Sequence, residues 1–104
     1  MAKEITLNEF NELVLANKEE LIVVDFYANW CGPCRMLAPI ITEVCEQNSV
    51  KLYKVNTDQN AELAKLNGVL ALPTVMLFRN GEMVEKFVGF RPYEAIDEII
   101  KQYK

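Results

Sequence analysis

An almost unbroken apolar run in the first third of the chain constrains the fold more than any other feature of the sequence. The run covers residues 21–28 and reads LIVVDFYA, with Asp25 as its one charged residue. Successive side chains of a strand point to opposite faces of a sheet, so a run that is apolar at both odd and even positions predicts a strand buried on both faces. Such a strand is typical of a sheet covered by helices on each side, and the run therefore predicts an α/β fold.

The segments around this run alternate between helical and strand patterns. Thr6 and Glu9 have the spacing of a capping box, which predicts that a first helix starts there, and Asn80-Gly81 is a strong signal for a two-residue hairpin. The other predicted elements are a helix over 34–47, a strand over 50–55, a short helix over 59–66 with Asp58 as its N-cap, strands over 75–79 and 82–88, and a last helix with Pro92 as its first residue. We therefore expect one domain over residues 1–104, an α/β sandwich with a mixed sheet of four to five strands between about four helices.

The composition excludes several classes of protein. Fifteen acidic residues against eleven basic residues give a net charge of −4, which disfavours binding to a phosphate backbone, so we expect no nucleic-acid partner. The apolar runs are much shorter than the roughly 20 residues that span a bilayer, and the first ten residues lack the apolar core of a signal peptide. We therefore expect a cytoplasmic protein with no membrane partner.

The absence of histidine limits the chemistry further. Without an imidazole the chain has no Ser-His or Cys-His nucleophilic pair and no histidine metal ligand, so proton transfer near neutral pH has to use a carboxylate, a lysine or a thiol. The chain has three cysteines, Cys31, Cys34 and Cys45. In a chain without an export signal, these residues indicate redox chemistry or metal binding rather than a disulfide scaffold.

Two cysteines lie where a helical pattern begins, in the segment Trp30-Cys31-Gly32-Pro33-Cys34. Sulfurs at this spacing can close a small disulfide ring. The free N–H groups of a helix N-terminus favour a thiolate at Cys31, whereas Cys34 lies a turn further in and is expected to be more buried. Gly32 allows close approach, and Pro33 stiffens the ring at a position where a backbone N–H would be unsatisfied. The segment therefore predicts sequential exchange, in which Cys31 attacks a substrate disulfide and Cys34 resolves the mixed disulfide.

The alternative interpretation of two cysteines at this spacing is half of a zinc site. Cys45 is the only further thiol, and if it shares a helix with Cys34 the two residues are roughly 16 Å apart, too far for shared ligation or a disulfide. Carboxylates would have to complete the zinc shell, so the pattern favours redox chemistry, and we expect no bound metal. Cys45 is interpreted as a packing thiol in the apolar stripe of the helix.

Together these residues resemble the thioredoxin family over essentially the whole chain. The segment VDFYANWCGPCRMLAP resembles the family's active-site segment, and Leu72-Pro73-Thr74, residues 78–82 and Val88-Gly89 follow it in the family's order. The resemblance implies the thioredoxin fold and a general protein-disulfide reductase and electron carrier, which contributes to cell redox homeostasis through a redox-active Cys31–Cys34 disulfide. It also implies no bound cofactor, disulfide-containing client proteins, and recharging by a thioredoxin reductase, a flavoprotein that uses NADPH. A monomer is the simplest expectation.

Asp25 and Lys54 are the charged residues of interest. A buried carboxylate without a partner is costly, so Asp25 should have either a raised pKa or a cationic neighbour, and the residues alone leave a structural ion pair as an equal alternative. The resemblance implies that Asp25 lies beneath the dithiol and accepts the proton of Cys34 during resolution, through water. It also implies that Lys54 neighbours and tunes Asp25; otherwise Lys54 is a solvated charge at a strand end.

The resemblance further implies a docking surface for client proteins. It implies that the peptide bond before Pro73 is cis and packs against the disulfide, while the backbone of Leu72 pairs with an extended client peptide. Main-chain pairing of that kind tolerates many client sequences. The apolar surface around the dithiol is expected to contain Trp30, Gly32, Pro33, residues 69–72 including Ala71, and residues 88–90 including Gly89. Taken one at a time, each of these residues is also compatible with an ordinary core.

Some positions depart from the family pattern. Tyr27 stands where many members carry a second tryptophan, Ala71 where a glycine is common and Phe90 where a smaller residue is usual. Arg91-Pro92 lacks the hydroxyl cap often seen on the last helix. These departures bear on partner fit and local stability rather than on the dithiol chemistry.

Two further functions stay open at the level of the sequence. The first is an oxidase or disulfide isomerase on the same fold, although the dipeptide between the cysteines of those proteins commonly contains histidine. The second is a binding module whose apolar rim docks a partner and whose cysteines are incidental. A reduction potential separates the first from a reductase, and partner binding that survives loss of both cysteines identifies the second.

Overall fold

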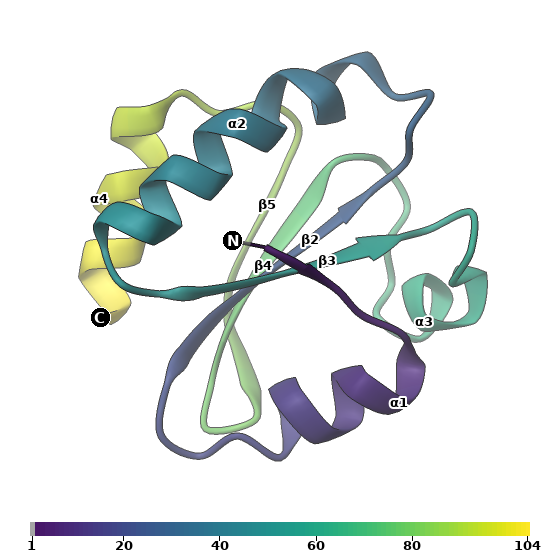
Figure 1. Ribbon diagram of the computed structural model, residues 1–104, viewed down its shortest axis with the longest axis horizontal. Coiled ribbons are helices and arrows are strands. Elements are labelled where there is room, and N and C mark those ends of the chain that lie inside the picture. The colour runs from purple at the N-terminus through teal and green to yellow at the C-terminus, as the bar shows by residue number, and fades with distance from the viewer. Residues whose placement is uncertain (1) are drawn as a thin grey trace.

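Within residues 2–104, the part of the chain that the computed structural model describes, five strands form one mixed sheet (Figure 1). The strands are β1 (Lys3–Glu4), β2 (Leu21–Tyr27), β3 (Lys51–Asn56), β4 (Thr74–Arg79) and β5 (Glu82–Val88), and their order across the sheet is β1-β3-β2-β4-β5. The helical segments are α1 (Leu7–Phe10), its π-helical continuation η1 (Asn11–Leu15), α2 (Gly32–Gln47), α3 (Ala61–Leu66) and α4 (Tyr93–Tyr103). This arrangement confirms the predicted α/β sandwich.

Helices cover both faces of the sheet, with α2 and α4 on one face and α1 and α3 on the other (Figure 1). The central strand β2 pairs in parallel with β3 and antiparallel with β4, so its backbone has a partner on each side. Its side chains alternate between the two apolar layers: Val23 packs with the α2 and α4 residues, and Val24 packs with those of α1 and α3. Burial on both faces is what the run over 21–28 predicts.

Strand direction gathers three connections at one end of the sheet. β2 and β3 are parallel and end on the same side, whereas β4 is antiparallel to β2 and begins there. The connection from β2 to α2, the connection after β3 and the segment before β4 are therefore neighbours. Ligands and reacting groups of open α/β sheets gather beyond the carboxyl ends of the parallel strands, and both cysteines of the predicted pair lie at this end.

The local start and turn signals are confirmed. Thr6 is the N-cap of α1, and its backbone N–H donates a hydrogen bond to Glu9 Oε1 at 3.1 Å. Asn80 and Gly81 both adopt positive φ, 57° and 79°, as a two-residue turn between β4 and β5 requires. Across residues 2–104, none of the helices is long and apolar enough to cross a membrane.

The start of α3 differs from the sequence prediction. Asn60 rather than Asp58 is the N-cap, and the helix begins at Ala61. The physical reason is a turn directly after β3: Asn56 Oδ1 accepts the backbone N–H of Asp58 at 2.9 Å, and the Asn56 carbonyl accepts that of Asn60 at 2.9 Å. Residues 57–60 therefore form a turn where the sequence predicts the N-cap and the start of the helix, and the Asp58 carboxylate does not cap the helix.

Two smaller differences lie at the ends of the chain. Strand β1 was not predicted, because two residues are too short to show a period, and it forms only through pairing with Tyr53 and Lys54 of β3. Pro92 is the extended N-cap residue of α4 rather than its first helical residue, with ψ at 165°. Neither difference moves the end of the sheet that carries the cysteines.

Candidate active site

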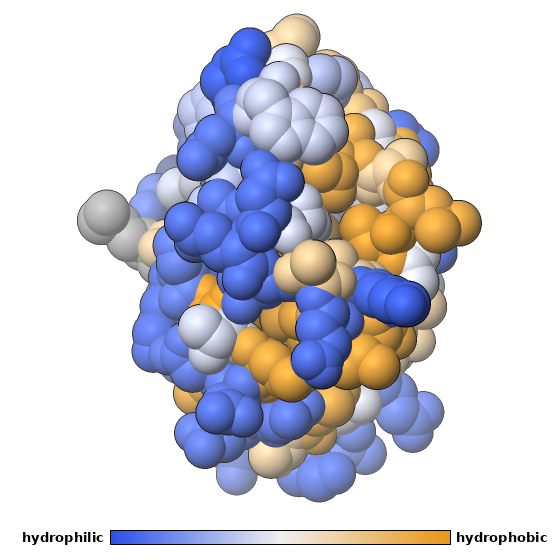
Figure 2. Space-filling model, turned by 90° about the vertical axis from the view of Figure 1, so that its right-hand side faces the viewer, coloured by the Kyte–Doolittle hydropathy of each residue, from blue (hydrophilic) through white to orange (hydrophobic). Residues whose placement is uncertain are grey.

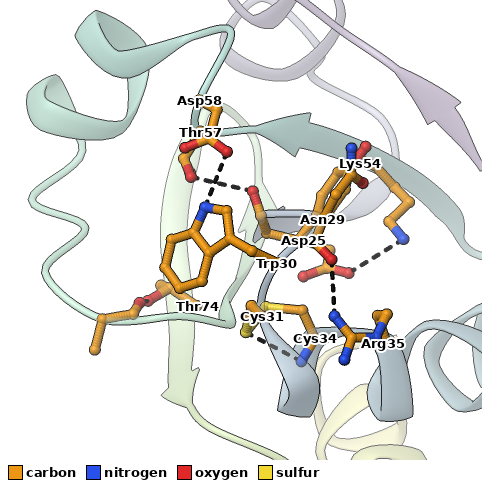
Figure 3. Close-up of a disulfide and its surroundings, with 12 residues drawn as sticks. Asp25, Asn29, Trp30, Cys31, Cys34, Arg35, Lys54, Thr57, Asp58 and Thr74 are labelled. Carbon is orange, nitrogen blue, oxygen red and sulfur yellow. Dashed lines mark hydrogen bonds and ion pairs between the residues drawn. A yellow bond between two sulfur atoms is a disulfide. The ribbon is translucent and has the colours of Figure 1, made fainter.

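Cys31 and Cys34 form a disulfide at the N-terminus of α2, directly after the loop that leaves β2 (Figure 3). Their Cα atoms are 5.2 Å apart. Cys31 is the N-cap residue, and its Sγ accepts the backbone N–H of Cys34 at 3.2 Å. Both residues are largely buried, and the exposed fraction of Cys31, 5%, is only slightly larger than that of Cys34, 3%. The Cys31 sulfur therefore occupies the position where the helix presents unpaired N–H groups.

Two side-chain hydrogen bonds brace the loop before the disulfide. The indole Nε1–H of Trp30 donates to Asp58 Oδ2 at 2.9 Å, and the guanidinium of Arg35 donates to the carbonyl of Asn29 at 2.8 Å (Figure 3). Trp30 is nevertheless 69% exposed. Sequence reasoning missed the bracing roles of Asp58 and Arg35, because nothing in the local pattern connects Trp30 to a carboxylate 28 positions away.

The segment before β4 packs beside the disulfide. The peptide bond between Leu72 and Pro73 is cis, as the family resemblance implies. Leu72 packs against the small cluster formed by Ala28 and the two cysteines. The carbonyl of Ala71 accepts the hydroxyl of Thr74 at 2.6 Å, and the carbonyl of Pro73 accepts the backbone N–H of Gly89 at 2.8 Å. These two hydrogen bonds hold residues 71–73 against the disulfide end of the sheet.

Asp25 is completely buried in the middle of the sheet. Lys54 Nζ lies 3.7 Å from Asp25 Oδ2, and Figure 3 shows the lysine pointing toward the carboxylate. Within the described part of the chain, neither carboxylate oxygen has a hydrogen-bond partner. Burial raises the pKa of Asp25 from 3.8 to about 6, although the charge of Lys54 opposes this shift. Both predicted properties, a raised pKa and a cationic neighbour, are therefore present, and the carboxyl titrates near neutral pH.

Cys45 is remote from this chemistry. It lies further along α2, where it packs with Leu37, Ile41 and Val44. Its exposed fraction is 2%, and burial raises its pKa to about 12. Over residues 2–104, no three or more cysteine, aspartate and glutamate side chains are grouped closely enough to hold a metal ion. The surroundings of Cys45 are those of a packing thiol.

A shallow apolar groove lies next to the disulfide. It has a volume of about 270 Å³ and is lined by Trp30, Thr57, Ala64 and residues 69–72. Leu70 on its rim is 98% exposed, and Leu66 at the end of α3 is 68% exposed. Figure 2 shows apolar side chains gathered on the face of the molecule that carries α3, with polar side chains around them. A larger hollow of about 560 Å³ lies beside β1 and β3, and no residue of the site lines it.

The fold and this site define a class of protein. A disulfide closed across the N-terminus of a helix, beside a cis-proline and directly after a strand that carries a buried carboxylate, is the centre of a thiol–disulfide oxidoreductase of the α/β type.

Comparison with known proteins identifies the family within that class. The Thioredoxin family model matches residues 1–102. Thioredoxin of Listeria monocytogenes is 41% identical over 105 residues, which cover 99% of each chain, and thioredoxin of Rickettsia bellii is 44% identical over 103 residues, 96% of each. The solved structure of Fasciola hepatica thioredoxin is similar with a TM-score of 0.90 at 36% identity, covering 98% of this chain and 99% of that one. The chain belongs to the thioredoxin family.

Family membership and the Cys31–Cys34 pair together establish the activity. The protein is a protein-disulfide oxidoreductase that reduces client disulfides and contributes to redox homeostasis. Its redox group is formed by its own two sulfurs.

Proposed function

We propose that Cys31 is the nucleophile and Cys34 the resolving thiol of this reductase. The thiolate of Cys31 attacks one sulfur of a client disulfide, forms a mixed disulfide and releases the other client sulfur as a thiolate. Cys34 then loses its proton and attacks Cys31 Sγ, which closes the Cys31–Cys34 disulfide and releases the second client sulfur. The client gains two electrons and the protein loses two.

One observation carries this assignment of roles. Cys31 is the N-cap of α2, and its Sγ already accepts the Cys34 backbone N–H at 3.2 Å. The free N–H groups and the dipole of the helix favour a negative charge at that sulfur, because they place partial positive charge around it. Gly32 and Pro33 are the first helical residues, and Pro33 needs no N–H partner there. Gly32 and Pro33 therefore set the shape of the small ring that the Cys31–Cys34 disulfide closes.

Asp25 is proposed as the proton acceptor for Cys34 during resolution, through water. A carboxyl with a pKa of about 6 is mostly ionised at pH 7, so it can accept a proton. Its pKa is also closer to the pKa of a thiol than the pKa of an exposed carboxyl is, which makes the transfer from Cys34 easier. Lys54 tunes Asp25, because the ammonium charge lowers the pKa that burial raises. Resolution is therefore expected to slow as the pH falls through about 6, where Asp25 takes up its own proton.

Client proteins are proposed to dock across the apolar rim of the disulfide. The support is the position of Trp30, Leu72 and Gly89 around the cysteines and the groove beside Ala71. The exposed indole of Trp30 and the backbone of Leu72 suit an extended peptide whose cysteine has to reach Cys31. The cis-Pro73 segment forms the floor against which that peptide lies.

The oxidised protein is proposed to be recharged by a thioredoxin reductase, a flavoprotein that draws its electrons from NADPH. NADPH thus acts indirectly, on the partner and not on this chain. We also propose that the chain functions as a single-domain monomer in the cytoplasm. The support is family membership, since relatives that share 96% to 99% of their length with this chain are named thioredoxin.

Turnover of a disulfide-bonded protein with dithiothreitol as reductant tests the roles of the cysteines. Cys31→Ser is expected to lower turnover to the rate of dithiothreitol alone. Cys34→Ser, reduced and freed of dithiothreitol before it meets the client, should stop after one attack, with the client held as a mixed disulfide visible on a non-reducing gel. Cys45→Ser, a matched control in the same helix, should retain turnover. Full activity of Cys31→Ser would refute the assigned nucleophile. Reduction with NADPH and a cognate reductase then tests the proposed recharging.

Asp25→Asn tests the proton acceptor. The variant is expected to form the mixed disulfide at a near-normal rate and to resolve it roughly 10²-fold or more slowly, since general-base catalysis commonly contributes that much. Stopped-flow Trp30 fluorescence separates the two steps. Unchanged resolution kinetics would remove Asp25 from the mechanism.

A further inference from the structure

Three charged residues form a row across three neighbouring strands. Glu4 of β1 is the register partner of Lys54 of β3, and Lys54 is the register partner of Asp25 of β2. Register partners on parallel strands project their side chains to the same face of the sheet. The row therefore places an ammonium group between two carboxylates on the face that α2 covers.

Tyr27 connects the two outer members of this row. It follows Asp25 by two positions on β2, so its side chain lies on the same face. Its hydroxyl donates a hydrogen bond to Glu4 Oε2, and Lys54 Nζ lies 4.5 Å from the centroid of its ring. Tyr27 also packs against the cluster that contains both redox cysteines. The ammonium of Lys54 is thus confined between the aromatic ring and the Asp25 carboxylate.

The ion pair by itself does not fix the lysine. Lys54 Nζ is 3.7 Å from Asp25 Oδ2, beyond hydrogen-bond distance, and a lysine side chain has four rotatable bonds. The side chain of Lys54 is only 15% exposed, and the ring of Tyr27 forms one wall beside its ammonium group. A cation over an aromatic ring within about 6 Å of its centroid is attracted by the ring's electron density.

We propose that Tyr27, anchored by Glu4, is a positioning residue that holds the Lys54 ammonium against Asp25. This inference rests on the proposed function, because it assigns the control of the proposed proton acceptor to a residue that acts on it through Lys54. Tyr27 occupies the position where many relatives carry a tryptophan. The tyrosine hydroxyl supplies the anchor to β1 through Glu4.

Few charged or titratable groups face Asp25. The facing charges are Lys54 on β3, which lowers its pKa, and Glu4 on β1, which raises it. The pKa of Tyr27 is raised to about 12, chiefly by burial and by Glu4, and that of Cys45 on α2 is also about 12. On the β4 side the register partner is Val75, which carries no charge. In the oxidised protein the two redox cysteines do not titrate.

The test follows the Asp25 carboxyl carbon by NMR against pH in the oxidised protein, with the signal assigned by its absence in Asp25→Asn. Tyr27→Leu is expected to raise the midpoint by on the order of half a pH unit, because the ammonium loses its wall and moves away from Asp25. Tyr27→Phe keeps the ring but loses the anchor to Glu4, and is expected to give a smaller upward shift. An unchanged or lowered midpoint in both variants overturns the proposal.

A double-mutant cycle shows whether Tyr27 acts through the lysine. Lys54→Gln alone is expected to raise the midpoint, and Tyr27→Leu in that background is expected to add no further shift. The same shift with and without Lys54 would mean that Tyr27 affects Asp25 directly, and it would overturn the positioning role. Tyr103→Phe is the matched control. The hydroxyl of Tyr103, on α4, donates to Glu85 Oε1 of β5 at 2.9 Å, and its loss should leave the midpoint unchanged.

The outcome is independent of the proposed role of Asp25. If Asp25→Asn resolves mixed disulfides normally while the midpoints shift as expected, the proton-acceptor role fails and the positioning role stands. If Asp25→Asn resolves mixed disulfides slowly but the Tyr27 variants leave the Asp25 midpoint unchanged, the proton-acceptor role stands and the positioning role fails.

Discussion

Asp25 lies in the most buried strand of the sheet, yet neither of its carboxylate oxygens accepts a hydrogen bond within residues 2–104. A buried charge that is only partly compensated destabilises the fold, and the cost depends on pH because the group can take up a proton. The folded protein binds that proton with a pKa of about 6, whereas an ordinary aspartate has 3.8. The cost is therefore absent well below pH 4, grows as the pH rises from about 4 to about 6, and is complete above that range.

Asp25→Asn is expected to stabilise the oxidised protein at neutral pH. The amide cannot ionise, so the free energy of unfolding at pH 7 should rise by about 3 kcal/mol, the free energy that corresponds to the pKa shift. The gain should shrink as the pH falls from 6, and only a small part of it should remain at pH 4, where the folded carboxyl is protonated and the unfolded one, with a pKa of 3.8, is still partly ionised. Urea unfolding at pH 4, 5, 6 and 7 measures it. A difference that does not change with pH would contradict a carboxyl that titrates in this range.

Cys45 is expected to resist alkylation in the reduced, folded protein. Its exposed fraction is 2%, and its pKa of about 12 leaves almost no thiolate at pH 8. Iodoacetamide followed by peptide mass spectrometry should find label on Cys31 within minutes and on Cys45 only after addition of urea. Labelling of Cys45 as fast as Cys31 in the native state would show that its segment of α2 opens.

At the scale of elements, the tight hairpin between β4 and β5 is held against the first helical segment of the chain. Gly81 has φ at 79°, and a Cβ placed on it would come within 2.5 Å of the carbonyl oxygen of Leu15, the last residue of η1. The position therefore needs glycine both for its conformation and for the close approach of another backbone. The turn signal in the sequence accounts for the first reason but not for the second.

Gly81→Ala is expected to lower the free energy of unfolding by at least about 2 kcal/mol, because it combines the left-handed conformation with a clash against backbone. Gly68→Ala is the matched control. Gly68 has a similar φ of 68°, but a Cβ there meets no atom within 4 Å, so only about 1 kcal/mol should be lost. Equal losses in urea unfolding would mean that the contact with Leu15 does not contribute.

At the scale of the whole molecule, the site exists because three connections far apart in the sequence meet at one end of the sheet. The disulfide comes from the start of α2, the indole brace from the turn after β3, and the groove from the segment before β4. Leu66 and Leu70 extend this apolar surface from the disulfide toward α3. A client bound at Cys31 therefore has an apolar path available on the α3 side.

Leu70→Arg is expected to raise KM for a client with apolar residues near its disulfide by roughly three- to tenfold, with little change in kcat. The substitution removes an apolar contact at the rim of the groove and leaves the sulfurs untouched. Met83→Arg is the matched control. Met83 is also an apolar residue with a large exposed fraction, 49%, but it lies at the start of β5, next to the hairpin and away from the disulfide end of the sheet. Equal effects of the two variants on KM would show that added charge rather than the groove is responsible.

The parts of the fold with a local physical cause were predictable. The apolar run over 21–28 predicts a strand buried on both faces, the Thr6–Glu9 spacing predicts the start of α1, and Asn80-Gly81 predicts the hairpin. Each of these depends on residues within a few positions of one another. The cysteine spacing is of the same kind, since it places two sulfurs on one helical turn. The cis bond at Pro73 came from the family resemblance, because a pattern of residues around a proline does not distinguish the isomers.

The features that were missed depend on contacts between distant segments. Strand β1 forms only because it pairs with the edge of β3. Asp58 can accept the hydrogen bond of Trp30 because it lies in the turn after β3 and does not cap α3. Tyr27 and Glu4 are 23 positions apart, and no periodicity connects them. The sequence by itself determined most of the helices and strands, the hairpin and the redox pair, because these follow from backbone geometry and neighbouring side chains. Only the tertiary structure decided which charges face Asp25, because that depends on how strands from separate parts of the chain align in the sheet.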